Sequence, residues 1–218
     1  MKPEIPDSRV LDALQTTDSI KNGEGPRGTF FRNYHTTCVA SKAIGLTLGS
    51  SKKAMLVPVK VGPVTILSYL EALWLAGYDI AEKRRHRKAV VLMTSSVSIQ
   101  SGLSILAIKL HMEIASKIGR DTIERLISHG IPIISSAGNY ALWPNGHGQL
   151  RNITDMVPSI FARDTPLIAV GFLQRNGELH PTSQHSPLGT NAVGTDIECI
   201  DYFGHIITTS GSSYCKFT

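Results

Sequence analysis

The segment IPIISSAGN, residues 131–139, joins a short apolar run to a turn of small residues that ends on a side-chain amide. A run of this length, bounded by turn residues, predicts a buried strand over residues 131–135. Gly138 permits a tight turn after that strand and leaves Asn139 at its end. Ligands bind outside the carboxyl ends of the strands in open parallel sheets, so Asn139 is a candidate site residue. Its amide is a neutral donor that can meet a developing oxyanion.

Further apolar runs on either side of this segment alternate with stretches of helical spacing. The predicted strands cover residues 54–61, 89–93 and 167–170, and the predicted helices cover 36–44, 66–77, 105–118 and 123–127, with a break or bend near Gly119. Strands that alternate with helices in this way imply βαβ units. We therefore predict an α/β fold in which a parallel sheet is flanked by helices in three layers.

Length and composition are consistent with one large globular domain. The chain has 218 residues, of which 42% are hydrophobic and 18% are charged. Residues 1–33 are polar and rich in glycine and proline, which predicts an irregular N-terminal segment. Residues 34–218 then form the domain.

The net charge of +5 comes in large part from a basic run over residues 83–88. A nucleic-acid groove requires aromatic side chains between its positive charges, and this run has none. We therefore expect an exposed turn and no nucleic-acid partner. No apolar stretch is long enough to cross a bilayer, and we expect no membrane partner.

The three cysteines, Cys38, Cys199 and Cys215, lack the CxxC spacing of a zinc or redox site. We expect no metal and no other cofactor. Their odd number predicts that they do not form a disulfide framework.

A histidine and a serine complete a candidate set for acyl transfer. His35 lies directly before a predicted helix, and histidine is the usual base that activates a hydroxyl at neutral pH. Ser213 ends the sequence Ser210-Gly211-Ser212-Ser213, in which a glycine turn can expose a hydroxyl. The order histidine, asparagine, serine therefore suggests hydrolysis through an acyl-enzyme.

Taken in order, the motifs of the chain resemble those of subtilisin-like serine peptidases. Among these, the sequence resembles fungal members most. The matching stretches are HTTCVAS (35–41), LVPVKV (56–61), VVLMT (90–94), GIPIISSAGN (130–139), VP (157–158), LIAVG (167–171), AVG (192–194) and SGSS (210–213). The resemblance implies that His35 is the general base and Ser213 the nucleophile. It implies that Asn139 and the backbone N–H of Ser213 form the oxyanion hole. It further implies a monomeric serine-type endopeptidase acting on peptides or proteins, in a family whose members are often secreted.

The resemblance leaves the third member of the triad open. That family places a D-[ST]-G motif after a first apolar strand, and Asp7-Ser8-Arg9 is the candidate here, with Arg9 in place of glycine. Asp12 and Asp18 are the alternatives.

Other departures from the family pattern lie close to the candidate site. Thr36 stands where the family has a glycine beside the base, and Val97 replaces a glycine of the edge strand. The chain continues only to Thr218, so the resemblance implies a truncated domain without the helix that follows the nucleophile. We therefore expect impaired activity, and the alternative is a catalytically inactive pseudoenzyme or peptide-binding remnant.

Overall fold

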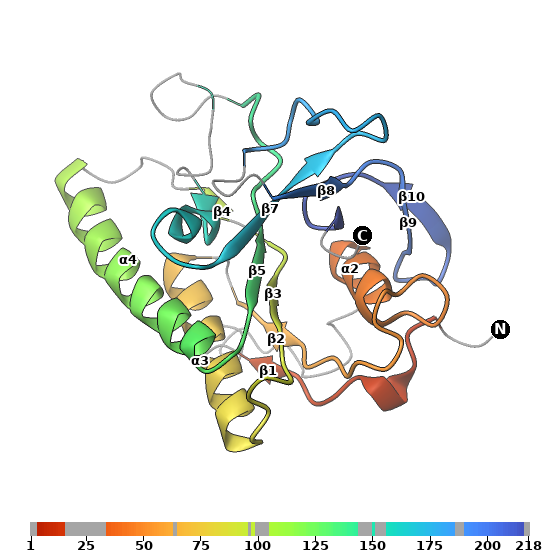
Figure 1. The fold of residues 1–218 in the computed structure, drawn as a ribbon, viewed down its shortest axis with the longest axis horizontal. Coiled ribbons are helices and arrows are strands. Elements are labelled where there is room, and N and C mark those ends of the chain that lie inside the picture. The colour runs from red at the N-terminus through yellow and green to blue at the C-terminus, as the bar shows by residue number, and fades with distance from the viewer. Residues whose placement is uncertain are drawn as a thin grey trace.

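The structure is a computed structural model, and it describes residues 4–15, 34–62, 65–95, 97–98, 105–143, 150, 156–185 and 190–215. Its elements form three layers (Figure 1). A parallel sheet lies in the middle, with α3 (Ile66–Glu82) and α4 (Ile105–Ser128) on one side and α2 (Tyr34–Ile44) on the other. The predicted α/β fold, a parallel sheet flanked by helices, is confirmed.

The central sheet contains the strand that ends before Asn139. Its order is β3-β5-β7-β8, and all three pairings are parallel. The strands are β3 (Val91–Met93), β5 (Ile133–Ser136), β7 (Ile168–Leu173) and β8 (Asn191–Val193). The sequence indicated the first three as apolar runs. It did not indicate β8, because both ends of that strand are exposed and no apolar run marks it.

Three two-stranded ladders surround this sheet. They are the parallel pair β1 (Leu14–Gln15) with β2 (Val59–Lys60), the antiparallel pair β4 (Val97–Ser98) with β6 (Met156–Val157), and the antiparallel hairpin β9 (Ile197–Ile200) with β10 (Ile206–Thr209). The 3₁₀ helices are η1 (Asp7–Arg9) and η4 (Ser159–Arg163). The segment predicted to be irregular thus contributes a short strand, β1, to the domain. Residues 16–33 lie outside the described residues, and the division of the chain at residue 33 stays a prediction.

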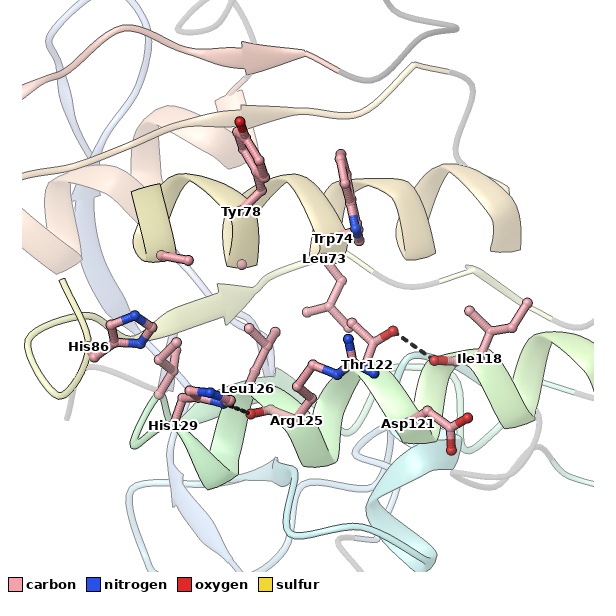
Figure 2. A pocket seen from close by; sticks show the side chains of 13 residues that line it. Leu73, Trp74, Tyr78, His86, Ile118, Asp121, Thr122, Arg125, Leu126 and His129 are labelled. Atoms are coloured by element: carbon pink, nitrogen blue, oxygen red, sulfur yellow. Dashed lines mark hydrogen bonds between the residues drawn. The ribbon is translucent and has the colours of Figure 1, made fainter. Parts of the chain in front are cut away.

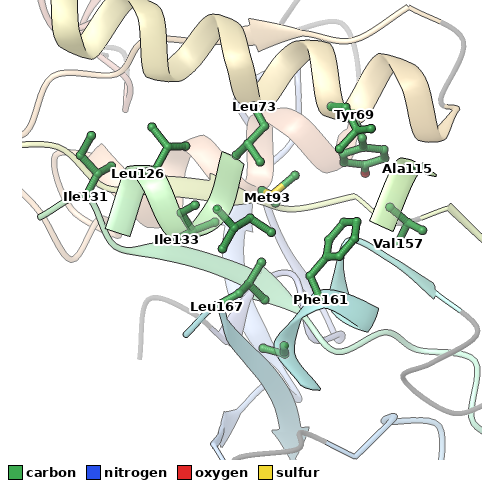
Figure 3. Packing of buried hydrophobic residues seen from close by; sticks show 14 of the residues in the cluster. Tyr69, Leu73, Met93, Ala115, Leu126, Ile131, Ile133, Val157, Phe161 and Leu167 are labelled. Carbon is green, nitrogen blue, oxygen red and sulfur yellow. The ribbon is translucent and has the colours of Figure 1, made fainter. Parts of the chain in front are cut away.

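The main hydrophobic core lies between the sheet and the two helices α3 and α4 (Figure 3). Its labelled members are Tyr69, Leu73, Met93, Ala115, Leu126, Ile131, Ile133, Val157, Phe161 and Leu167. The strand residue Ile133 and its neighbour Ile131 are almost fully buried, at 0% and 1% exposure. Burial of these apolar side chains is the main favourable term that fixes β5, and with it the start of the turn to Asn139.

Helix α4 runs from Ile105 to Ser128 without the interruption predicted at Gly119. The prediction of a break there was wrong, and packing supplies the reason. A Cβ at Gly119 would lie 2.5 Å from Cζ of Phe161 and 2.8 and 3.0 Å from two further ring atoms. The ring of Phe161 therefore packs against α4 at Gly119.

We expect Gly119→Ala to lower the free energy of unfolding by up to about 2 kcal/mol. Overpacking a core costs about 1–3 kcal/mol, whereas alanine improves a helix interior by about 1 kcal/mol. Urea unfolding followed by circular dichroism measures the change. The matched control is Gly77→Ala in α3, whose new Cβ meets only the flexible end of the Leu126 side chain, at 2.7 Å. A Gly119→Ala protein more stable than wild type would show that Phe161 does not pack there.

The basic run forms the exposed turn that the sequence predicted. Residues 83–88 follow α3, and Arg84 and Arg87 adopt positive φ angles of 52° and 58°. Lys83 and Arg85 both pair with the buried carboxylate of Asp79. Two charges of the basic run therefore form ion pairs with a buried carboxylate near the end of α3.

Candidate active site

The loop that carries Ser213 crosses the carboxyl ends of the central strands. The backbone N–H of Gly211 donates to the carbonyl of Gly194 after β8, over 2.8 Å. Two residues later, the hydroxyl of Ser213 donates to the carbonyl of Thr94 after β3, also over 2.8 Å. Ligand sites in parallel sheets occur at this edge.

Asn139 lies at the end of β5 and binds the same loop through its side chain. Its Oδ1 accepts hydrogen bonds from the backbone N–H of Ser212, at 2.9 Å, and from the Ser212 hydroxyl, at 2.7 Å. Both bonds use the amide oxygen, so the amide nitrogen is the group left to act as a donor. A Cβ at Gly211 would lie 2.9 Å from Asn139 Nδ2, and the φ of Gly211 is +152°. Glycine at position 211 therefore lets the loop pass close to this donor.

The hydroxyl of Ser213 is not poised for attack in this arrangement. The residue is 5% exposed, and its proton lies on the carbonyl of Thr94. A hydroxyl has one proton to donate, so the hydrogen bond to Thr94 must break before that proton can pass to an imidazole.

His35 lies in the first turn of α2 and is half-buried. Its ring centroid is 5.4 Å from that of Tyr214, with the two ring planes inclined at 52°. Since Tyr214 follows Ser213 directly, the structure places the predicted base beside the loop of the predicted nucleophile. Of the four predicted residues, His35, Asn139 and Ser213 thus gather around one loop.

Tyr214 is buried, at 5% exposure, although it was not singled out from the sequence. Burial raises the pKa of its phenol, a hydrogen bond with the side chain of Thr209 lowers it, and the proximity of Tyr34 raises it further. Because the net shift is upward, the Tyr214 phenol stays neutral throughout the range in which histidine titrates. Its ring therefore contacts His35 as an uncharged surface.

Asp7 lies elsewhere. It is exposed, belongs to η1 and precedes β1 in the chain. The family motif places its aspartate after the first strand, so a matching residue would follow β1. Arg9, which lies in η1 with Asp7, donates to the carbonyl of Ile44, the last residue of α2. His35 is at the opposite end of that helix, about 13 Å away at the rise of an α-helix. The structure therefore does not bring Asp7 together with His35.

The alternatives to Asp7 are placed as follows. Asp12 is also exposed and also precedes β1. Asp18 lies outside the described residues, and in the sequence it comes three residues after Gln15, the last residue of β1. Of the three aspartates, only Asp18 follows that strand.

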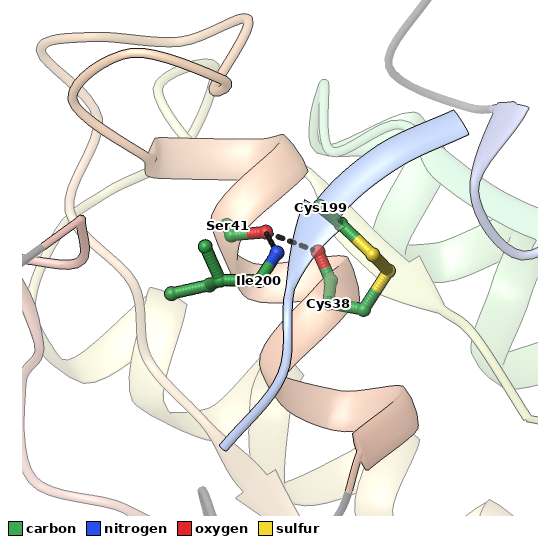
Figure 4. The surroundings of a disulfide bond; sticks show 4 residues. All are labelled: Cys38, Ser41, Cys199 and Ile200. Atoms are coloured by element: carbon green, nitrogen blue, oxygen red, sulfur yellow. Dashed lines mark hydrogen bonds between the residues drawn. A yellow bond between two sulfur atoms is a disulfide. The ribbon is translucent and has the colours of Figure 1, made fainter. Parts of the chain in front are cut away.

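A disulfide joins Cys38 in α2 to Cys199 in β9, although the odd number of cysteines argued against a disulfide framework (Figure 4). The Cα atoms are 5.0 Å apart, and both residues are 0% exposed. They are separated by 161 residues, so the short-range spacing rules could not detect the pair. Cys215 is the remaining cysteine, and it is buried and not part of a disulfide.

A pocket of about 390 Å³ lies between α3 and α4 (Figure 2). Its lining residues are Leu73, Trp74, Gly77, Tyr78, Ala81, His86, Ile118, Asp121, Thr122, Arg125, Leu126, His129 and Ile131. None of the four predicted site residues lines it. The pocket is therefore separate from the candidate active site.

Within the described ranges, no three side chains of histidine, cysteine, aspartate or glutamate gather closely enough to hold a metal ion. The helices that the structure describes include none long and apolar enough to span a bilayer.

Sequence reasoning missed Thr94 and Ser212 as contacts of the site. Thr94 contributes a backbone carbonyl, and every residue has one, so no residue type could have marked it. Ser212 belongs to the SGSS motif, but its contact with Asn139 spans 73 positions of the chain. Only the fold brings these groups together.

No protein-family model and no curated protein sequence matches the chain. Solved structures do match. A cold-adapted subtilisin-like serine proteinase gives a TM-score of 0.64 at 18% identity, over 99% of this chain and 67% of that one. The epidermin leader peptide processing serine protease from Staphylococcus aureus gives 0.70 at 14% identity, over 99% and 59%. The nisin leader peptidase from Lactococcus lactis gives 0.69 at 12% identity, over 99% and 71%.

This chain thus spans between 59% and 71% of the length of these three proteins. At identities of 12–18%, the similarity to these structures shows a shared fold and does not show a shared reaction. The chain has the fold of the subtilisin-like serine proteases.

Proposed function

We propose that this protein is a serine-type endopeptidase that hydrolyses peptide bonds through an acyl-enzyme. One observation carries the proposal. Asn139 binds Ser212 through its amide oxygen and keeps its amide nitrogen as a donor beside the loop that contains Ser213. His35 lies against the next residue of that loop, Tyr214. The proposed nucleophile, base and oxyanion donor therefore all lie on or beside one loop.

The chemistry follows from these groups. Ser213 Oγ attacks the peptide carbonyl carbon while His35 takes the hydroxyl proton, and the carbonyl π electrons move onto oxygen. Asn139 Nδ2 and the Ser213 backbone N–H donate to that oxyanion. Collapse re-forms the carbonyl and expels the amine, which takes the proton from His35. Water then repeats the sequence on the acyl-enzyme and releases the carboxylic acid. Before the first step, the Ser213 hydroxyl must leave the Thr94 carbonyl.

Peptides or proteins are the proposed substrates, and a monomer is the proposed form. The substrate class agrees with the fold neighbours, two of which process or cleave leader peptides. Nucleic acids and membranes have no part in the proposed reaction.

A second candidate function is peptide binding without turnover. The observation that favours it is the state of Ser213, which is 5% exposed and donates its only proton to Thr94. If that contact persists when peptide binds, the site binds substrate and does not cleave it.

A fluorophosphonate probe and a fluorogenic peptide library separate the two functions. We expect the wild-type protein to be labelled on Ser213 and Ser213→Ala to lose both labelling and turnover. Ser210→Ala is the matched control, because Ser210 is exposed and contacts the backbone N–H of Asp196 rather than Asn139. It should label like wild type. Peptide binding without labelling would support the second function, and labelling that persists in Ser213→Ala would contradict the assignment of the nucleophile.

We expect Asp7→Asn to keep the rate of probe labelling within about twofold of wild type, because substitutions at exposed positions away from a functional site have small effects. The reason is the position of Asp7 near the far end of α2 from His35. Labelling rates over pH 6 to about 9 measure the effect, since histidine titrates with a pKa near 6.5. Asp18→Asn is the comparison that tests the remaining alternative. A large loss in Asp7→Asn, with none in Asp18→Asn, would return Asp7 to the triad.

A further inference from the structure

We propose that Tyr214 and the Cys38–Cys199 disulfide form one positioning unit that holds His35 against the loop of Ser213. The inference rests on the proposed function for its kinetic consequence. Neither Tyr214 nor the two cysteines is a catalytic residue, because they act through His35 and touch no reacting atom in the proposed reaction.

The disulfide connects the helix that carries the proposed base to the hairpin that precedes the proposed nucleophile. Cys38 lies on α2 one helical turn after His35. Cys199 lies on β9, where it pairs with Ile207 of β10. Strand β10 ends at Thr209 and leads directly into the loop of Ser213. The sulfur–sulfur bond is therefore a covalent link between the helix of His35 and the hairpin that precedes Ser213.

Tyr214 packs onto this link and onto His35 at the same time. It belongs to one buried cluster with Cys38, Val39, Ile197 and Cys199. Its ring lies 5.4 Å from the ring of His35. Its hydroxyl interacts with Thr209 at the end of β10, so the ring is held from its far side as well.

A hydrogen-bonded bridge beside the disulfide fixes the same face of α2. Ser41, which is 0% exposed, donates from its hydroxyl to the carbonyl of Cys38 over 2.8 Å. The same oxygen accepts the backbone N–H of Ile200 over 3.2 Å (Figure 4). Helix and hairpin are thus joined by a covalent bond and by a buried hydroxyl one turn further along α2. The ring of Tyr214 extends this contact to the end of the helix where His35 lies.

The expected consequence is a change in kcat rather than in KM. A misplacement of about 1 Å of a catalytic group can cost on the order of 10² in rate. We therefore expect Tyr214→Leu and the double variant Cys38→Ala/Cys199→Ala to lower kcat by about 10- to 100-fold. KM should change little, since none of these side chains binds the substrate. Tyr214→Phe keeps the ring and should stay within about fivefold of wild type, the cost of one neutral hydrogen bond.

Redox treatment supplies a matched control. Reduction of the wild-type protein with a phosphine should lower the rate of probe labelling, and reoxidation should restore it. Cys38→Ala/Cys199→Ala should not respond, although it retains Cys215 and therefore the same free-thiol chemistry. Near-ultraviolet circular dichroism on each sample shows that the compared proteins are folded.

A spectroscopic measurement tests the positioning of His35 without any turnover. Carbon–proton correlation spectra report the imidazole of His35, assigned by its loss in His35→Gln. The resonance should move in Tyr214→Leu and on reduction, and should stay near its wild-type position in Tyr214→Phe. A resonance that stays at its wild-type position both in Tyr214→Leu and on reduction would overturn the positioning unit.

The two proposals fail in different ways. If the wild-type protein is not labelled but the His35 resonance responds as expected, the positioning unit stands and the peptidase function is wrong. If the wild-type protein is labelled and the folded variants are labelled at the same rate with the same KM, the peptidase function stands and the positioning unit is wrong.

Discussion

Replacement of Asn139 by alanine is expected to lower kcat by about 10²–10³-fold, the loss found when one oxyanion donor is removed from enzymes of the subtilisin type. That magnitude belongs to those enzymes, and we apply it to this chain because the fold agrees and the motif resemblance assigns Asn139 to the position of that donor. The physical reason is that the amide nitrogen of Asn139 faces the loop of Ser213 where negative charge develops on the substrate. A fixed dipole there stabilises the transition state more than the ground state.

The two ends of the Asn139 amide can be tested separately. Asn139→Asp keeps an oxygen that can accept the N–H and the hydroxyl of Ser212, at 2.9 and 2.7 Å in the present protein. It replaces the donor by a carboxylate oxygen, so we expect a loss at least as large as in Asn139→Ala. Ser212→Ala removes one bond to the amide oxygen and leaves the donor in place. We expect it to cost about tenfold or less, in line with one net hydrogen bond.

Kinetics of fluorogenic peptide cleavage by the three variants measure these effects, with KM determined alongside kcat. If Ser212→Ala lowers kcat as much as Asn139→Asp does, then Asn139 acts by fixing the loop and not by donating to the oxyanion. If none of the three variants changes kcat, Asn139 has no part in the reaction.

Removal of the Cys38–Cys199 disulfide is expected to lower the free energy of unfolding by about 2–5 kcal/mol. The bond closes a loop of 161 residues, and constraint of the unfolded chain grows with the length of the loop. Both cysteines are fully buried beside Tyr214, so the sulfur atoms also fill space in the small core between α2 and β9. Urea unfolding of Cys38→Ala/Cys199→Ala against the oxidised wild-type protein measures the loss.

Cys215→Ala is the matched control, because Cys215 is buried, at 1% exposure, and forms no disulfide. We expect it to cost about 1 kcal/mol, the value of a small buried apolar group and one weak hydrogen bond. A thiol assay on denatured, oxidised wild-type protein should find one free thiol of three. Three free thiols, or a double variant no less stable than Cys215→Ala, would show that the disulfide does not form in solution.

Local patterns predicted the elements whose burial is continuous along the chain. The run at residues 131–135 became the largely buried β5, and the run at 89–93 became β3, whose residues are partly or fully buried, because strands covered by other elements are rich in apolar residues. The strand β8 escaped prediction because its ends are exposed. Helix α4 was predicted with a break at Gly119 because glycine weakens a helix on average, whereas packing against Phe161 offsets that cost here.

The residues of the candidate site could be predicted better than their contacts. His35, Asn139 and Ser213 were singled out by residue type and by the motifs around them, and the fold gathers them around one loop. Asp7 was singled out by a partial motif, and the fold places it near the far end of α2. A motif carries information about its own few residues, and it carries none about the direction in which the chain approaches them.

The sequence by itself determined the α/β class, the positions of three of the four strands of the central sheet, and the residue types available for acyl transfer. These features depend on hydrophobic periodicity and on side-chain chemistry, both of which are local properties of the chain. Only the tertiary structure decided that the proton of Ser213 lies on Thr94, that Tyr214 lies against His35, and that Cys38 meets Cys199. Each of these contacts joins residues more than a hundred positions apart. Such contacts form because burial of the whole core brings distant segments together, and no short stretch of sequence contains that information.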